Sequence, residues 1–198
     1  MKTKIFITGS SGFIGFHVSK RYLDKGFKVC GFDSMNNYYD VGLKKSRLKI
    51  LKNYKNFSFI KGNLENQKIL NKSIIRFKPS IIIHLAAQAG VRYSIKNPKV
   101  YLNSNIIGTY NLIEVAKKLK VKHLMIGSSS SVYGSNKKFP FQEIDKTDNQ
   151  VSLYAAITKI RKYTLDLYKK LEKEVDHSAG LRLNGALSIA QNKGRWQE

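Results

Sequence analysis

The sequence predicts an α/β protein built on a doubly wound parallel β-sheet. Short apolar, β-rich segments alternate with longer helical patterns, which is typical of βαβ units around a parallel sheet. A glycine-rich turn directly follows the first apolar segment. The chain has 198 residues, 42% of them hydrophobic, which suffices for one well-packed domain but is short for two.

The individual elements follow from the positions of the apolar runs. Strands are predicted at Lys4–Thr8, Lys28–Asp33, Phe57–Lys61, Ser80–Leu85, Lys122–Ser128 and, from a less regular pattern, His177–Leu183. Helices are predicted at Phe13–Lys25, Gln67–Phe77, Pro98–Leu119 and Ser152–Lys173. In the last helix a stripe expected to face the core recurs every three or four residues, at Ile157, Ile160, Thr164, Leu167, Leu171 and Val175. Right-handed crossovers between the strands then give the doubly wound arrangement.

The turn after the first strand reads Thr8-Gly9-Ser10-Ser11-Gly12-Phe13-Ile14-Gly15 and leads into a helix. Gly9 permits the tight turn, Gly12 lets the backbone approach a pyrophosphate, and Gly15 lets helix and strand pack closely. The helix amino terminus offers free N–H groups and a positive dipole end to phosphates. Strand, turn and helix occur in the order that a Rossmann dinucleotide site requires.

Asp33 closes the second predicted strand, 18 residues after Gly15. A carboxylate at this place accepts hydrogen bonds from both ribose hydroxyls of a dinucleotide. It would repel a 2′-phosphate, so the sequence favours NAD over NADP. The alternative interpretation of Asp33 is a simple turn residue.

The charge of the chain raises a second class of function. The formal net charge is +23, and basic surfaces bind nucleic acid through its phosphates. However, 29 of the 36 basic residues are lysines, scattered along the chain, whereas base readout favours arginine. A lysine-rich solvated surface therefore explains the charge better than a specific nucleic-acid site.

Targeting signals and disulfides are not indicated. The apolar runs, such as residues 81–83, are far too short to span a bilayer, and no signal-peptide pattern follows Met1. The single cysteine, Cys30, has no partner for an internal disulfide. A cytoplasmic location is the expectation.

Besides the glycine turn and Asp33, five further segments form recognisable motifs: Asn36-Asn37-Tyr38-Tyr39-Asp40, His84-Leu85-Ala86-Ala87-Gln88-Ala89-Gly90-Val91-Arg92-Tyr93-Ser94, Asn105-Ile106-Ile107-Gly108-Thr109, Ser128-Ser129-Ser130-Ser131-Val132-Tyr133-Gly134 and Ser152-Leu153-Tyr154-Ala155-Ala156. Together these motifs resemble the extended short-chain dehydrogenase/reductase family of NAD-dependent epimerases and dehydratases. The set is most similar to UDP-glucuronate 4-epimerases, and it covers about residues 3 to 158.

The resemblance implies a reaction and a set of residues. In such enzymes a tyrosinate takes the proton of the sugar C4 hydroxyl while the nicotinamide takes the C4 hydride, and the 4-keto sugar turns over before reduction. By position Tyr154 is the base and Ser129 holds the reacting oxygen, with Ser131 as a second candidate. The cofactor-binding residues implied are Gly9, Ser11, Gly12, Phe13, Ile14, Gly15, Asp33, Asn36, Asn63, Leu64, Leu85, Ala86, Ala87, Gln88, Asn105 and Ser128. The alternatives are a polar loop for the serines and a core aromatic for Tyr154.

The chain departs from the family pattern at two site positions. The family places a lysine four residues after the tyrosine, where it lowers the pKa of the phenol, which is otherwise ~10. Here the fourth residue is Thr158 and Lys159 is the fifth. On a helix the fourth position lies ~40° from Tyr154 and the fifth ~140°, so Lys159 is expected to be a displaced catalytic lysine. Asn63 replaces the usual aspartate and can still accept a hydrogen bond from adenine.

The carboxyl-terminal residues also differ from the family. Residues 184–198 do not match its continuation, so the expected organisation is a Rossmann domain at 1–183, a polar tail at 184–198 and a largely missing substrate subdomain. The first hypothesis is an NAD-dependent UDP-glucuronate-type epimerase impaired by these changes. The others are an NAD-binding module without catalysis, a nucleotide-sugar dehydratase, which would want an acidic residue near Ser129, and last a nucleic-acid-binding protein. The family also implies a homodimer through helices 98–119 and 152–173.

Overall fold

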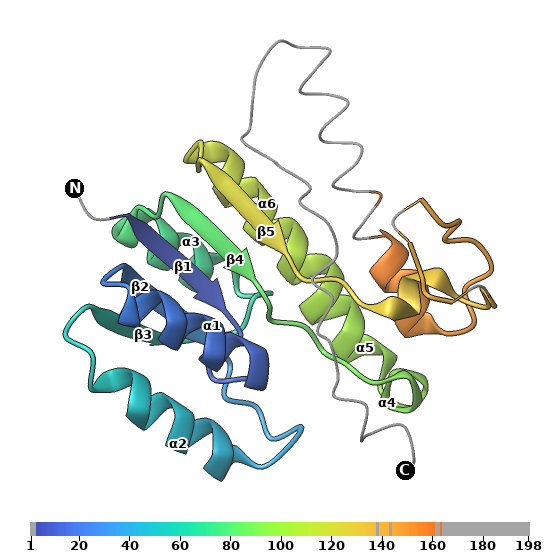
Figure 1. Cartoon of the computed structure of the whole chain (residues 1–198), viewed down its shortest axis with the longest axis horizontal. Helices are drawn as coiled ribbons and strands as arrows, with labels where there is room; N and C mark the ends of the chain where they lie inside the picture. The colour runs from blue at the N-terminus through green and yellow to red at the C-terminus, as the bar shows by residue number, and fades with distance from the viewer. Residues whose placement is uncertain (1–2, 138, 143, 161–162, 164–198) are drawn as a thin grey trace.

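The computed structural model describes residues 3–137, 139–142, 144–160 and 163. Its centre is a five-stranded sheet in the order β3-β2-β1-β4-β5, in which every pairing is parallel. The strands are β1 (Lys4–Thr8), β2 (Lys28–Asp33), β3 (Phe57–Lys61), β4 (Ile81–His84) and β5 (His123–Ile126). The predicted doubly wound parallel sheet is therefore confirmed (Figure 1).

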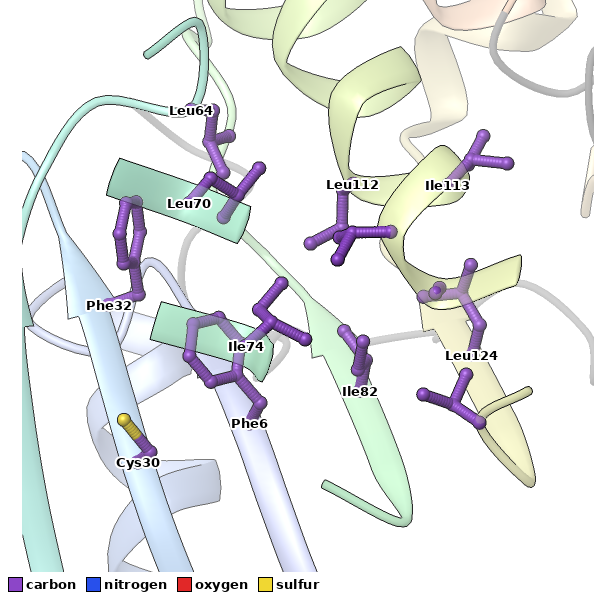
Figure 2. Packing of buried hydrophobic residues seen from close by; sticks show 13 residues of the cluster. Phe6, Cys30, Phe32, Leu64, Leu70, Ile74, Ile82, Leu112, Ile113 and Leu124 are labelled. Atoms are coloured by element: carbon purple, nitrogen blue, oxygen red, sulfur yellow. The ribbon is translucent and has the colours of Figure 1, made fainter. Parts of the chain in front are cut away.

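Helices pack on both faces of the sheet, because the residues of each strand alternate in direction. Phe6 of β1 joins Ile82 of β4 in a cluster with α3 (Gln67–Phe77) and α6 (Gly108–Lys118), shown in Figure 2. Its neighbours Ile5 and Ile7 point to the other face, where they pack with α1 (Phe13–Asp24) and α2 (Val41–Lys52). Ile5, Phe6 and Ile7 of β1 are all fully buried.

The strand order creates a crevice at one edge of the sheet. From β1 the chain builds outward to β2 and β3, and then crosses to the other side of β1 to form β4 and β5. In open parallel sheets ligands bind outside the carboxyl ends of the strands, at the point where the order reverses. This point lies between β1 and β4, where Thr8 is paired with His84.

Two helices appear that the apolar pattern did not predict. In α2 only Lys44 and Leu51 are buried, so the helix carries almost no apolar periodicity. Its start is marked instead by Asp40, whose carboxylate accepts a hydrogen bond from Gly42 N at 2.6 Å. The second is α4 (Val91–Lys96), a short helix in which only Ser94 is buried.

The predicted helix at 98–119 was wrong as a single regular element. It consists of α5 (Pro98–Tyr101), a π-helical segment η1 (Leu102–Ile107) and α6. The terminal residues of other elements also shift, since β4 and β5 lose one or two residues at each end compared with the prediction and α1 ends at Asp24. Such shifts are common at element ends.

The carboxyl-terminal part is described as far as a helix over residues 153–160, which follows a 3₁₀ turn, η2 (Ser130–Tyr133). Of the predicted core stripe Ile157 is buried at 1% exposure, but Ile160 is 47% exposed, so the stripe was wrong at Ile160. The rest of the stripe, the predicted strand His177–Leu183 and the tail at 184–198 lie outside the described residues. In the described part of the chain, no helix has the length and apolar character needed to cross a membrane.

Candidate cofactor site and catalytic loop

The glycine turn lies at the carboxyl end of β1 and has no room for side chains. Gly9 adopts φ +71°, and a Cβ there would lie 2.8 Å from Ala86 N. A Cβ on Gly15 would lie 2.0 Å from Gly9 O. Gly12 N donates to Gly9 O at 3.0 Å, which closes the turn. Gly12 is also the N-cap of α1 and supplies no side-chain cap, so the first N–H groups of α1 are available to a phosphate.

Asp33 lies beside this turn, with 6% of its surface exposed. One carboxylate oxygen accepts from Ser11 N at 3.0 Å and the other from Met35 N at 2.8 Å. A carboxylate has about four acceptor positions, so two remain for a ligand. The turn and the carboxylate together fit the pyrophosphate and the adenosine ribose of a dinucleotide.

A cavity of about 300 Å³ opens over these residues. Among the side chains predicted from the sequence, those that line it are Gly9, Gly12, Asp33, Asn36, Asn63, Leu64, Leu85, Ala86, Ala87 and Gln88. They come from the ends of β1, β2, β3 and β4, which the parallel sheet brings to one edge. A volume of this order is typical of small-molecule sites.

The remaining predicted cofactor residues lie around the cavity rather than on its lining. Ser11 contributes its backbone N–H to Asp33, and Gly15 packs α1 against the turn. Phe13 is 62% exposed, with the Arg47 guanidinium 5.8 Å from its ring centroid. Ile14 lies in the first turn of α1, and Ser128 is exposed after β5.

Asn105 has a structural position that the sequence did not reveal. It is buried in η1, where its side-chain amide pairs with the backbone of Gln88. Gln88 N donates to Asn105 Oδ1 at 2.7 Å, and Asn105 Nδ2 donates to Gln88 O at 2.9 Å. Asn105 therefore holds the segment after β4 in its place at the cavity.

The cavity also contains side chains that sequence reasoning missed: Phe32, Ser34, Tyr38, Tyr39, Lys44, Gly62, Glu65, Val100 and Ser104. Lys44 is the least expected, because it is a buried lysine on the unpredicted helix α2. Its Nζ donates to Asn36 O at 2.8 Å and to Asn36 Oδ1 at 2.6 Å. Burial lowers the pKa of Lys44, an effect that the nearby Asp33 carboxylate opposes. The segment at residues 36–40 before α2 was the available signal, since its first residue, Asn36, contacts this lysine.

The predicted catalytic residues lie on the loop after β5 and on the helix over 153–160. Ser129 is the N-cap of η2, and its Oγ lies 3.2 Å from both the N and the Oγ of Ser131. Tyr154 is half-buried in the first turn of the helix, and its ring meets that of Tyr101 edge-on at a centroid distance of 5.9 Å.

Lys159 contacts Asp148 rather than Tyr154. Its Nζ lies 3.2 Å from Asp148 Oδ1 and 5.4 Å from the ring centroid of Tyr163. Residues 153–160 are α-helical throughout, with no π-turn that would bring the fifth position round to Tyr154. The fourth position holds Thr158, which is buried and donates from Oγ1 to Tyr154 O at 2.8 Å. In the described residues no three His, Cys, Asp or Glu side chains gather as metal ligands.

A search of family models matches residues 6–175 to GDP-mannose 4,6 dehydratase. The chain belongs to this family. Its motifs, its parallel sheet and its glycine turn agree with the membership that the sequence resemblance predicted.

The names of individual relatives indicate a narrower activity than the name of the family does. The chain is 47% identical over 170 residues to a probable UDP-glucuronate 4-epimerase of Rhizobium meliloti, covering 86% of this chain and 50% of that protein. It is 40% identical over 182 residues to UDP-glucuronate 4-epimerase 1 of Arabidopsis thaliana, covering 91% of this chain and 41% of the relative. The chain thus spans about half the length of the relatives it matches.

The fold resembles solved epimerases. A UDP-glucuronic acid 4-epimerase from Bacillus cereus, in complex with UDP-glucuronic acid and NAD, matches with a TM-score of 0.77 and 30% identity. That match covers 85% of this chain and 52% of the other. The UDP-Glc/GlcNAc 4-epimerase of Campylobacter jejuni, at 24% identity and a TM-score of 0.78, supports the fold alone; the match covers 87% of this chain and 50% of the other.

Proposed function

We propose that this chain binds NAD in the cavity over β1 and β4 and forms the cofactor half of a UDP-glucuronate-type 4-epimerase. The observation that carries the proposal is the combination of a glycine turn that excludes side chains with a carboxylate at the end of β2. The similarity to UDP-glucuronate 4-epimerases supports the choice of reaction.

The proposed roles follow from the chemistry of the residues. Bound NAD supplies a reversible hydride acceptor for the sugar C4. The N–H groups of α1 hold the pyrophosphate, and Asp33 accepts from the ribose hydroxyls. Tyr154 accepts the proton of the C4 hydroxyl, and Ser129 donates to the same oxygen. Asn63 accepts from the adenine amino group.

One observation favours a second function, an NAD-binding module with little or no epimerase activity. A tyrosine becomes a base at neutral pH when a neighbouring cation lowers the pKa of its phenol. Lys159 is instead paired with Asp148, and Thr158 occupies the position one helical turn after Tyr154. We infer that the proton transfer at Tyr154 is impaired in this chain.

Calorimetric titration distinguishes these functions. The purified chain is titrated with NAD, and then with UDP-glucuronate in saturating NAD. Binding of NAD alone supports the module, while binding of both ligands supports an epimerase. Absence of NAD binding contradicts both proposals.

The effect of the lysine position is tested by placing a lysine at position 158, four residues after Tyr154. Thr158→Lys places an ammonium on the Tyr154 face of the helix, so epimerase turnover is expected to rise at least 10-fold if the substrate binds. Lys159→Ala is the matched control and is expected to leave turnover unchanged, because Lys159 contacts Asp148. A large loss of turnover in Lys159→Ala would show that Lys159 already acts on Tyr154.

We also propose that the chain forms homodimers through α6 and the helix over 153–160. An apolar groove of about 330 Å³ lies between them, lined by residues that include Ile107, Tyr110 and Ile160. These three side chains are 45–53% exposed. Light scattering at high protein and salt concentration is expected to give a dimer, and Tyr110→Glu a monomer. A monomeric parent chain would contradict the proposal.

A further inference from the structure

We propose that Tyr101 is a positioning residue that couples the cofactor segment after β4 to Tyr154. The proposal rests on the proposed function for the role of Tyr154, but its contacts are those of Tyr101 itself. Tyr101 ends α5 and is fully buried, although it carries a polar hydroxyl. It touches both the segment at 85–90 and the catalytic tyrosine.

The hydroxyl of Tyr101 holds the backbone at the end of that segment. It lies 2.6 Å from Ala89 O and 2.5 Å from Gly90 O, so its single proton is shared between two carbonyl acceptors. Burial raises the pKa of Tyr101 to about 12, with smaller contributions in the same direction from neighbouring tyrosines. The Tyr101 phenol therefore stays protonated at neutral pH and keeps its donor.

Tyr101 is the first of three residues that bind the chain from His84, the last residue of β4, to Gly90 at successive points. Asn105 pairs with the backbone of Gln88, and Thr109 Oγ1 lies 3.0 Å from His84 Nε2. Thr8 Oγ1 accepts from Leu85 N and Ala86 N, so its proton goes to His84 Nδ1 at 2.7 Å. His84 Nε2 then carries the ring proton and donates to Thr109. Residues 101, 105 and 109 thus bind residues 89–90, 88 and 84 in order.

The π-helical segment η1 explains how three residues spaced by four share one line. In a regular α-helix each step of four residues turns the direction by ~40°, so Thr109 would lie ~80° from Tyr101. A π-turn accommodates one additional residue, and eight residues then rotate about as far as seven, which leaves a difference of ~20°. The hydrogen-bonding side chains of Tyr101, Asn105 and Thr109 therefore stay close to one face of the helix, although the helical hydrogen bonds change register within Leu102–Ile107.

The ring of Tyr101 makes the second connection. Tyrosine rings form a continuous row from the cavity to the helix over 153–160: Tyr38 to Tyr93 at 4.9 Å, Tyr93 to Tyr101 at 6.2 Å, and Tyr101 to Tyr154 at 5.9 Å between centroids. Tyr38 lines the cofactor cavity. Close-packed rings resist rotation, so a change in the cavity segment is transmitted to the orientation of Tyr154.

Two substitutions of Tyr101 distinguish the role of its hydroxyl from the role of its ring. Tyr101→Phe keeps the ring and removes the hydrogen bonds to Ala89 and Gly90. We expect hydrogen exchange of the amides at 88–91 to accelerate at least 10-fold and the Kd for NAD to rise 3- to 10-fold. Nitration of Tyr154 by tetranitromethane, followed by peptide mass, should stay within 2-fold of the parent chain.

Tyr101→Leu removes the ring as well, so nitration of Tyr154 should accelerate at least 3-fold. Tyr22→Phe is the matched control, because Tyr22 packs edge-on against Phe27 near the end of α1, away from the cavity. It should leave exchange at 88–91, the Kd for NAD and Tyr154 nitration unchanged.

The proposal is overturned if Tyr101→Phe lowers the melting temperature but leaves both exchange at 88–91 and the Kd for NAD unchanged, since Tyr101 would then be a core residue alone. It is also overturned if Tyr101→Leu leaves Tyr154 nitration unchanged. A parent chain that binds no NAD refutes the proposed function, while the exchange and nitration results still decide the role of Tyr101.

If the variants do not fold, hydrogen exchange of the parent chain with and without NAD decides. Protection of the amides is expected jointly at 88–91 and 153–157, and protection confined to 88–91 overturns the proposal.

Discussion

Gly15→Ala tests whether close packing at the glycine turn outweighs helix propensity. Gly15 lies inside α1, where alanine is normally favoured over glycine by ~1 kcal/mol. The new Cβ, however, would lie 2.0 Å from Gly9 O and 2.7 Å from Gly9 C. Both neighbours are backbone atoms of the turn, so the strain cannot be relieved by rotating a side chain.

The expected change in the free energy of unfolding follows from the balance between overpacking strain and helix propensity. Overpacking of a tight site costs about 1–3 kcal/mol, and more where backbone must move. We expect a net loss of ~2 kcal/mol after the gain in helix propensity. For a chain of this size, that corresponds to a decrease in melting temperature of roughly 4–8 °C. Displacement of the turn should also weaken NAD binding at least 10-fold.

The assay is thermal unfolding followed by circular dichroism, together with calorimetric titration of NAD. Gly26→Ala is the matched control, because a Cβ there meets no atom within 4 Å although φ is +78°. Only backbone strain of about 1–2 kcal/mol is then expected, with an unchanged Kd for NAD. An unchanged or higher melting temperature in Gly15→Ala would refute the packing argument.

Three further predictions follow from the site. Asp33→Asn should weaken NAD binding at least 10-fold, and its affinity for NADP should fall less, because the carboxylate that repels a 2′-phosphate is gone; equal losses for both cofactors in calorimetry would contradict this. Burial lowers the pKa of Lys44, so the unfolded chain binds more protons than the folded one between that lowered pKa and 10.5, and the stability contribution of Lys44 rises with pH across this window. Lys44→Met should flatten that rise in denaturant titrations from pH 8 to 10.5, whereas Lys45→Met, at an exposed neighbour, should not; equal slopes in the two variants would count against the argument. Asp148→Asn should change stability by less than ~1 kcal/mol, because Asp148 is 60% exposed and surface ion pairs contribute little. A larger loss on chemical unfolding would show that this pair holds the helix over 153–160 in place.

Much of the fold could be predicted because the relevant signals are local. A strand that is buried on both faces must be apolar along its length, as at residues 81–83, and the order of these runs implies a parallel sheet. Helix α2 was not predicted, because it buries only Lys44 and Leu51 and therefore carries no apolar stripe that a local pattern could reveal. The break of the helix at 98–119 was equally hidden, because a π-turn leaves no composition signal in Leu102–Ile107.

For the candidate site, too, the local features could be predicted from the sequence and the long-range contacts could not. By itself the sequence determined the parallel sheet, the glycine turn, the acidic residue at the end of β2 and the displacement of Lys159 by one position, because each depends on the identity and spacing of nearby residues. Only the tertiary structure decided that Lys159 pairs with Asp148, that Lys44 enters the cofactor cavity, and that Tyr101 connects residues 89–90 to Tyr154. These contacts join residues that are distant in the chain or lie on elements without a sequence signature, and packing of the completed fold determines which of them meet.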